Sequence, residues 1–139
     1  MAAADKKRTG TYNFKRKVSV MVAEGLLEAD ILVDGLIPFH LPDNSFITGV
    51  SVNVTTVSGT GSSTVDVLVG STVIANEVPV TVAGATVAND LDSVTRKFAT
   101  GGDITLKAGA VTPADGALVC DLIIEYIELS KKGQEYTQY

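Results

Sequence analysis

The chain of 139 residues has no tryptophan, and aromatic residues make up only 6% of it. It has one cysteine, Cys120, so no disulfide can form within the chain. It has one histidine, His40, so the usual zinc sites built from several cysteines and histidines are excluded by count. Charged residues contribute 19%, below the average of about 25% for globular proteins. The sequence therefore offers few groups for catalysis or metal binding.

Long apolar runs are also missing. No stretch approaches the roughly 18 apolar residues that a membrane-spanning helix needs. The basic N-terminal segment is not followed by the apolar core of a signal peptide. We therefore expect no membrane partner.

The charges that are present are unevenly distributed. Residues 1–17 carry six basic residues and one acidic residue, a net charge of +5, and the rest of the chain has a net charge of −10. This asymmetry predicts a basic N-terminal arm (1–17), a folded body (18–130) and a polar C-terminal tail (131–139). The arm is either a solvated extension or a segment that binds an acidic partner. Because the acidic body would repel a polyanion, we expect no nucleic-acid partner.

Valine and threonine dominate the body, and both favour pleated strands over helices. Two runs of alternate valines flank the turn-rich segment SGTGSS at 58–63: Val50, Val52 and Val54 before it, and Val65, Val67 and Val69 after it. This arrangement predicts a β-hairpin over residues 46–70.

Alternate valines also predict a strand that begins at Val18, whereas residues 26–33 fit either a helical turn or another strand. Prolines at 38 and 42 exclude a central strand from residues 37–46. Pro79 indicates an edge strand, which follows a predicted turn at residues 75–77.

The second half of the body contains fewer regular runs. Residues 83–103 predict a long loop with one short strand around residues 94–98. Residues 117–129 predict the last strand, with Leu118, Cys120, Leu122, Ile124 and Tyr126 on its core face. About eight short strands separated by turns predict an all-β fold. We expect a single β-sandwich of jelly-roll type, with a small barrel as the alternative.

The candidate catalytic residues are few, and each has a simpler structural explanation. His40 could act as a base or ligand, but a partly buried histidine in a turn is the favoured interpretation. Cys120 alternates in step with leucines, which indicates a core thiol. Asp121 and Glu125 lie four residues apart on one strand, about 13 Å, which is too far for a glycosidase pair. We expect no enzyme activity and no cofactor.

Acidic and glycine-rich loop segments are the remaining candidates for ligand binding. Neither Asn89, Asp90 and Asp92 nor Asp43 and Asn44 have the spacing of a known calcium loop, and all are common turn residues. The glycines at 59 and 61 lack the lysine of a phosphate-binding loop. We therefore predict no metal site.

Three features carry a resemblance to a known class of proteins: the basic arm, the segment LPDNSFITGVSVNVTT (41–56), and the late strand pair GDITL and ADGALVCDLIIEY. Together they resemble small β-rich virion proteins of tailed bacteriophages, in particular capsid decoration (cement) proteins with a jelly-roll-like body. The resemblance covers roughly residues 36–129 and is one of general pattern.

The resemblance implies a homotrimer on the outer capsid surface that clamps neighbouring major capsid subunits. The basic arm would then bind the capsid through Lys6, Lys7, Arg8, Tyr12, Phe14, Lys15, Arg16 and Lys17. The alternatives are a tail, baseplate or head-completion protein, and a carbohydrate-binding β-sandwich. The last class usually presents aromatic platforms, which a chain without tryptophan is poorly equipped to form.

Overall fold

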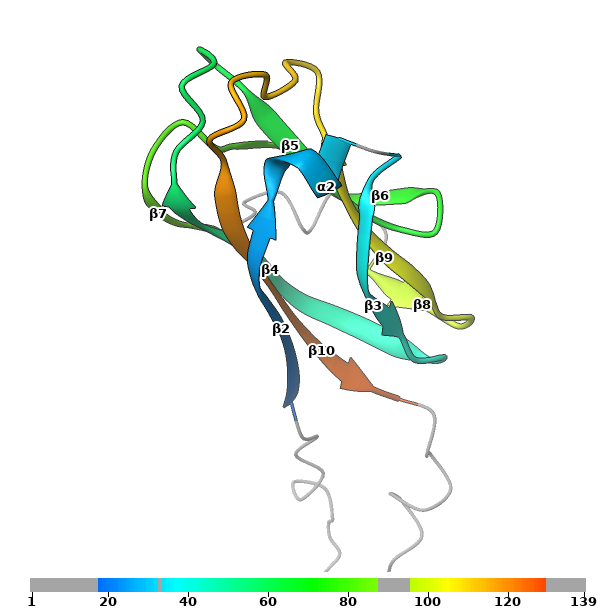
Figure 1. Cartoon of the computed structure of the whole chain (residues 1–139). Coiled ribbons are helices and arrows are strands. Elements are labelled where there is room, and N and C mark those ends of the chain that lie inside the picture. Colours follow the sequence, from blue (N-terminus) through cyan, green and yellow to red (C-terminus); the bar gives the residue numbers. More distant parts are fainter. Residues whose placement is uncertain (1–17, 33, 88–95, 130–139) are drawn as a thin grey trace, which may run out of the picture.

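The computed structural model describes residues 18–32, 34–87 and 96–129, which fold as a sandwich of two antiparallel sheets (Figure 1). The first sheet has the strand order β2-β10-β4-β7, and β8 also pairs with β4. Its strands are β2 (Val18–Leu27), β4 (Ser45–Thr56), β7 (Gly84–Val87), β8 (Lys97–Phe98) and β10 (Val119–Glu128). The second sheet has the order β3-β9-β5-β6. Its strands are β3 (Leu36–Leu41), β5 (Thr64–Val69), β6 (Thr72–Pro79) and β9 (Gly102–Ala108). The predicted all-β sandwich is confirmed.

The first and last described strands are neighbours. Val18 of β2 is paired with Ile127 of β10, so the beginning and the end of the described chain lie at the same end of the sandwich. Figure 1 shows β2 in blue beside β10 in orange. Residues 1–17 and 130–139 therefore both join the body at this end.

The core lies between the two sheets and is built from alternate residues of each strand. On β10, Cys120, Leu122 and Ile124 are fully buried, and Tyr126 packs against the core, as the sequence predicts. Each large apolar side chain buried in this way contributes about 1.5–3 kcal/mol to folding. The alternation along β10 thus fixes which face of the first sheet is internal.

The predicted hairpin over residues 46–70 is wrong. β4 belongs to the first sheet and β5 to the second, so the two strands face each other across the core and do not pair. Val52 and Val67 are both completely buried, each pointing inward from its own sheet. Alternation identifies the buried face of a strand but not its partner, and the segment 57–63 crosses between the sheets.

The segment 26–33, for which the sequence allows a helix or a strand, is divided between two elements. β2 continues to Leu27, and the short helix α2 (Glu28–Leu32) follows. Ile31 of α2 is buried in the core, and the Glu28 N–H donates to Leu118 O at 3.0 Å. One helical turn therefore closes this end of the sandwich.

β3, which contains Pro38, and β6, which contains Pro79, lie at the two edges of the second sheet, as expected for strands that contain proline. The exclusion of a central strand from residues 37–46 is wrong at its end, because Ser45 and Phe46 begin β4 and are paired on both sides. The predicted turn at residues 75–77 is wrong, because β6 continues through it with one irregular residue, Glu77, at φ 57°. β7 was not predicted, and β8 falls within the predicted short strand around 94–98.

Candidate interaction surface

A row of apolar side chains lies on the outer face of the first sheet. On β2, the side chains of Val18, Val20 and Val22 point away from the core and are 49%, 53% and 50% exposed. The neighbouring strand β10 adds Ile123 and Ile127, which are paired with Val22 and Val18. We call these five residues the outer apolar face. The valines are exposed and the isoleucines are partly buried. Contiguous apolar side chains that reach the surface of a folded protein commonly mark interaction sites.

The acidic residue in the middle of β10 does not interrupt this face. Glu125 is paired with Val20 on one side and with Gly49 on the other. Its side chain lies over Gly49, since a Cβ built at Gly49 would be 3.1 Å from Glu125 Oε1. The Glu125 carboxylate is thus directed toward β4 and away from the valines of β2.

The carboxylate of Asp121, rejected above as half of a glycosidase pair, forms hydrogen bonds within the fold. Oδ1 accepts a hydrogen bond from the Gly25 N–H at 2.9 Å, and Oδ2 accepts one from Asn53 Nδ2 at 2.9 Å. Gly25 has φ +68° at an irregularity in the β2–β10 pairing. Asp121 therefore fastens this irregularity to the centre of the sheet.

A basic side chain lies over Phe46 of β4, which is paired with Ile127. The guanidinium carbon of Arg96 is 4.7 Å from the centre of the Phe46 ring. Arg96 Nε also donates to Ile47 O at 3.1 Å, so the guanidinium is held in place. A cation over an aromatic ring is stabilised by about 0.5–1 kcal/mol at exposed sites.

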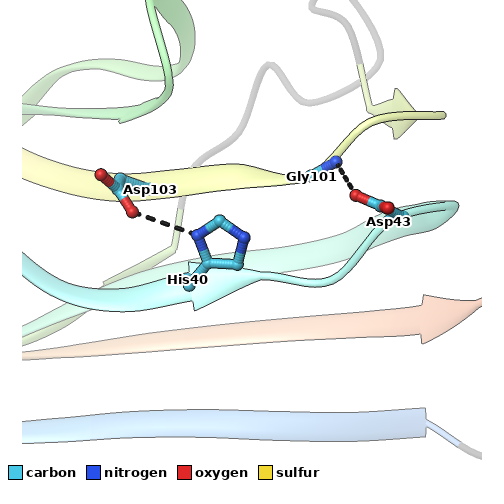
Figure 2. Close-up of polar contacts among 4 residues, drawn as sticks. All are labelled: His40, Asp43, Gly101 and Asp103. Carbon is cyan, nitrogen blue, oxygen red and sulfur yellow. Dashed lines mark hydrogen bonds and ion pairs between the residues drawn. The ribbon is translucent and has the colours of Figure 1, made fainter.

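On the second sheet, Figure 2 shows the exposed His40 of β3 beside Asp103 of β9. His40 Nδ1 is 3.1 Å from Asp103 Oδ1, and the two side chains are 66% and 58% exposed. Beside them, Asp43 Oδ1 accepts a hydrogen bond from the Gly101 N–H at 2.7 Å. The expectation of a partly buried histidine in a turn is wrong, because His40 lies exposed on β3. An exposed pair of this kind contributes about 0–1 kcal/mol.

Cys120 is a core residue, as predicted. Its side chain is fully buried, and burial, with a smaller contribution from the neighbouring Asp121 charge, raises the pKa of the thiol to about 11. Because the thiolate is the reactive form, this thiol is not suited to nucleophilic chemistry at neutral pH.

The Gly/Ser-rich segment 58–63 is held by a neighbouring loop. Asp115 Oδ2 accepts the Gly59 N–H at 2.5 Å, and Thr60 Oγ1 accepts the Ala114 N–H at 2.9 Å. Glu28, which is buried, accepts the Gly116 N–H at 2.6 Å. These bonds join the β2–β3, β4–β5 and β9–β10 connections at one end of the sandwich. The carboxylates of Asp115 and Glu28 therefore have a structural role.

Several predicted site residues lie outside the described residues. They are the arm residues Lys6, Lys7, Arg8, Tyr12, Phe14, Lys15, Arg16 and Lys17, and the loop residues Asn89, Asp90 and Asp92. Within residues 18–32, 34–87 and 96–129, no three His, Cys, Asp or Glu side chains gather in a way that could hold a metal ion. No helix in that part of the chain is long and apolar enough to cross a membrane.

The comparisons with known proteins found no matching family model, no similar curated protein and no similar solved structure.

Proposed function

We propose that this protein is a structural virion protein that binds the outer surface of a phage capsid through its outer apolar face. The observation that carries the proposal is the row of apolar side chains on the first sheet. It consists of three half-exposed valines beside two partly buried isoleucines, whereas the second sheet presents the polar side chains of His40 and Asp103 together with the exposed Ile37. A partner that covers the apolar side gains about 25 cal/mol for each Å² of apolar surface removed from water.

The proposed mechanism is stabilisation by mass action. A protein that binds neighbouring major capsid subunits only when they are assembled adds its binding free energy to the assembled shell. Repetition of the same contact over many sites makes a modest single contact sufficient. The shell then resists dissociation without any chemical step.

The basic arm belongs to the same proposal. Residues 1–17 join the body at Val18, which is itself part of the outer apolar face. Attractive contacts of Lys6, Lys7, Arg8, Lys15, Arg16 and Lys17 with an acidic shell surface, with Tyr12 and Phe14 as apolar anchors, would therefore adjoin the apolar contact. The arm would speed the encounter, because complementary charges raise association rates.

The jelly-roll topology is also part of the proposal. It is supported by the strand orders β2-β10-β4-β7 and β3-β9-β5-β6, in which the chain changes sheets at each connection from β2 to β5. Jelly rolls are common in viral capsid proteins. A homo-oligomeric state is proposed as well; the trimer implied by the resemblance stays a prediction.

The test is binding of the purified protein to capsid shells that lack it, measured by co-sedimentation. The double variant Ile123→Lys, Ile127→Lys places two charges on the outer apolar face and should weaken binding roughly tenfold or more. The matched control is Ile37→Lys, at an isoleucine 55% exposed on the second sheet, which should bind like the wild type. Equal binding by all three proteins would refute the proposal.

The arm is tested separately. A chain that begins at residue 18 should remain folded, as judged by circular dichroism, and should occupy fewer shell sites. Unchanged occupancy would remove the arm from the proposal while leaving the outer apolar face in it. Binding to purified tails in place of shells would instead favour a tail or baseplate role.

A further inference from the structure

The described edge strands are β2, β7 and the two-residue β8 in the first sheet and β3 and β6 in the second, and all except β2 carry features that discourage pairing with another chain. β7 has only four residues and begins at Gly84 with φ +108°. β3 contains Pro38 and a register shift, and β6 ends at Pro79 and has the irregular residue Glu77. Short length, prolines and bulges are the usual protections of an exposed edge.

β2 is different over its first six residues. Residues 18–23 have the sequence VSVMVA, without charge, proline or glycine. They pair with β10 in an unbroken register from Val18↔Ile127 to Ala23↔Leu122. No described strand pairs with the other side of β2. A regular, uncharged, β-branched edge of this length is a template for a further strand.

We propose that the further strand is β2 of a second copy of this chain, paired antiparallel about a two-fold axis at Val20. The register that keeps like faces together pairs Val18 with Val22 of the other copy and Val20 with its own equivalent. Residues directly opposite in an antiparallel pair are about 4.5–5.5 Å apart between Cβ atoms, so the valines of both copies form one row. Ser19 then lies opposite Met21 on the inner face.

No charge opposes this register. Residues 18–23 carry no charged side chain, so the pairing of two copies brings no like charges together within the segment. Glu24 is exposed, and the pairing of β2 becomes irregular just beyond it at Gly25. The segment is therefore complementary to its own copy, with valine facing valine on the outer side.

The pairing has two structural consequences. It joins the first sheets of two copies into one continuous sheet, on which the two outer apolar faces form a single surface. It also uses the β2 edge of both copies, so the assembly is a closed dimer and no β2 edge remains for a third copy to pair with. The proposal thus differs from the trimer implied by the sequence resemblance, and a molar mass distinguishes the two.

The first experiment measures the molar mass of the free full-length protein by light scattering over a range of concentrations. The expected mass is twice that of the 14.5 kDa chain. Val20→Lys puts a charge at the two-fold axis and should raise the dimer dissociation constant more than tenfold. Ile37→Lys is the matched control, because Ile37 is 55% exposed on the edge strand β3, and it should stay dimeric. Circular dichroism of each variant establishes that it is folded.

A charge pair tests the register and does not depend on Val20. Because Val18 faces Val22 of the second copy in this register, Val18→Lys should weaken the dimer, and Val18→Lys combined with Val22→Glu should restore it. A monomeric or trimeric wild type, or a dimer unaffected by both Val20→Lys and Val18→Lys, would overturn the proposal. Because this experiment uses no capsid shells, its failure is distinguishable from failure of the proposed docking function.

Discussion

The carboxylate of Asp115, in the connection between β9 and β10, accepts a hydrogen bond from the backbone N–H of Gly59, 56 residues earlier in the chain. It also accepts the Ala117 N–H at 3.3 Å. The bond from Gly59 is the main reason that the pKa of Asp115 lies below its ordinary value of 3.8. The Asp115 side chain thus links the β9–β10 connection to the β4–β5 connection.

This contact predicts a specific dependence of stability on pH. A carboxyl group with a lowered pKa in the folded state stabilises the fold above its unfolded pKa, and that contribution is lost as pH falls through the folded pKa. Asp115→Asn should therefore lower the midpoint of thermal unfolding by a constant amount at neutral pH, and the difference from wild type should shrink below about pH 3.8.

The measurement is a series of thermal unfolding scans of both proteins from pH 7 to pH 2.5. His40→Ala serves as the control, because the His40–Asp103 pair is exposed and should contribute about 0–1 kcal/mol. If the Asp115→Asn difference stays the same throughout the pH range, the charge of Asp115 is not what stabilises the loop.

Much of the fold could be predicted from the sequence because alternation of apolar residues reports burial directly. The buried positions Leu118, Cys120, Leu122 and Ile124, at and just before the start of β10, and the edge position of the strand with Pro79 were predicted correctly. Strand pairing could not be predicted in the same way. β4 and β5 both bury alternate valines, and the pattern is identical whether two strands pair or pack face to face.

The outer apolar face could not be predicted because β2 reverses the usual rule. Its valines point outward, whereas Ser19, Met21 and Ala23 point inward, where Met21 packs against the core. Nothing within the six residues shows which face is internal, since both faces are uncharged. The role of Asp121 was equally hidden, because it depends on Gly25 and Asn53, from distant strands.

A close approach of two loops predicts intolerance at Gly101. A Cβ built there would overlap the carbonyl oxygen of Leu41, which is backbone and cannot turn aside. Gly101→Ala should therefore destabilise the protein by about 1–3 kcal/mol, the usual cost of forcing extra atoms into a packed site. The matched control is Gly61→Ala, where a Cβ would meet nothing within 4 Å. Urea unfolding of both variants makes the comparison, and equal stability would argue against a close contact between Gly101 and Leu41.

Burial of the only cysteine predicts its reactivity. With its pKa raised to about 11, the Cys120 thiol is almost entirely protonated at pH 8 and is screened from solvent. A disulfide reagent such as dithiobis(nitrobenzoate) should label the folded protein slowly and the protein in guanidinium chloride at once. The native labelling rate should follow the population of the open state, so the destabilised Gly101→Ala variant should be labelled faster. Rapid labelling of the folded wild type would contradict the core position of Cys120.

Two isoleucines allow a direct comparison of a core position with a surface position. Ile124 of β10 is completely buried, whereas Ile37 of β3 is 55% exposed. Truncating a buried isoleucine to alanine removes its transfer free energy and leaves a cavity, so Ile124→Ala should cost about 2–5 kcal/mol. Ile37→Ala should change the free energy of unfolding by about 0.5 kcal/mol or less. Urea unfolding at a fixed protein concentration measures both, because a protein that dimerises gains apparent stability with concentration. A larger loss at Ile37 than at Ile124 would mean that β3 is covered and that the second sheet, not the first, carries the contact surface.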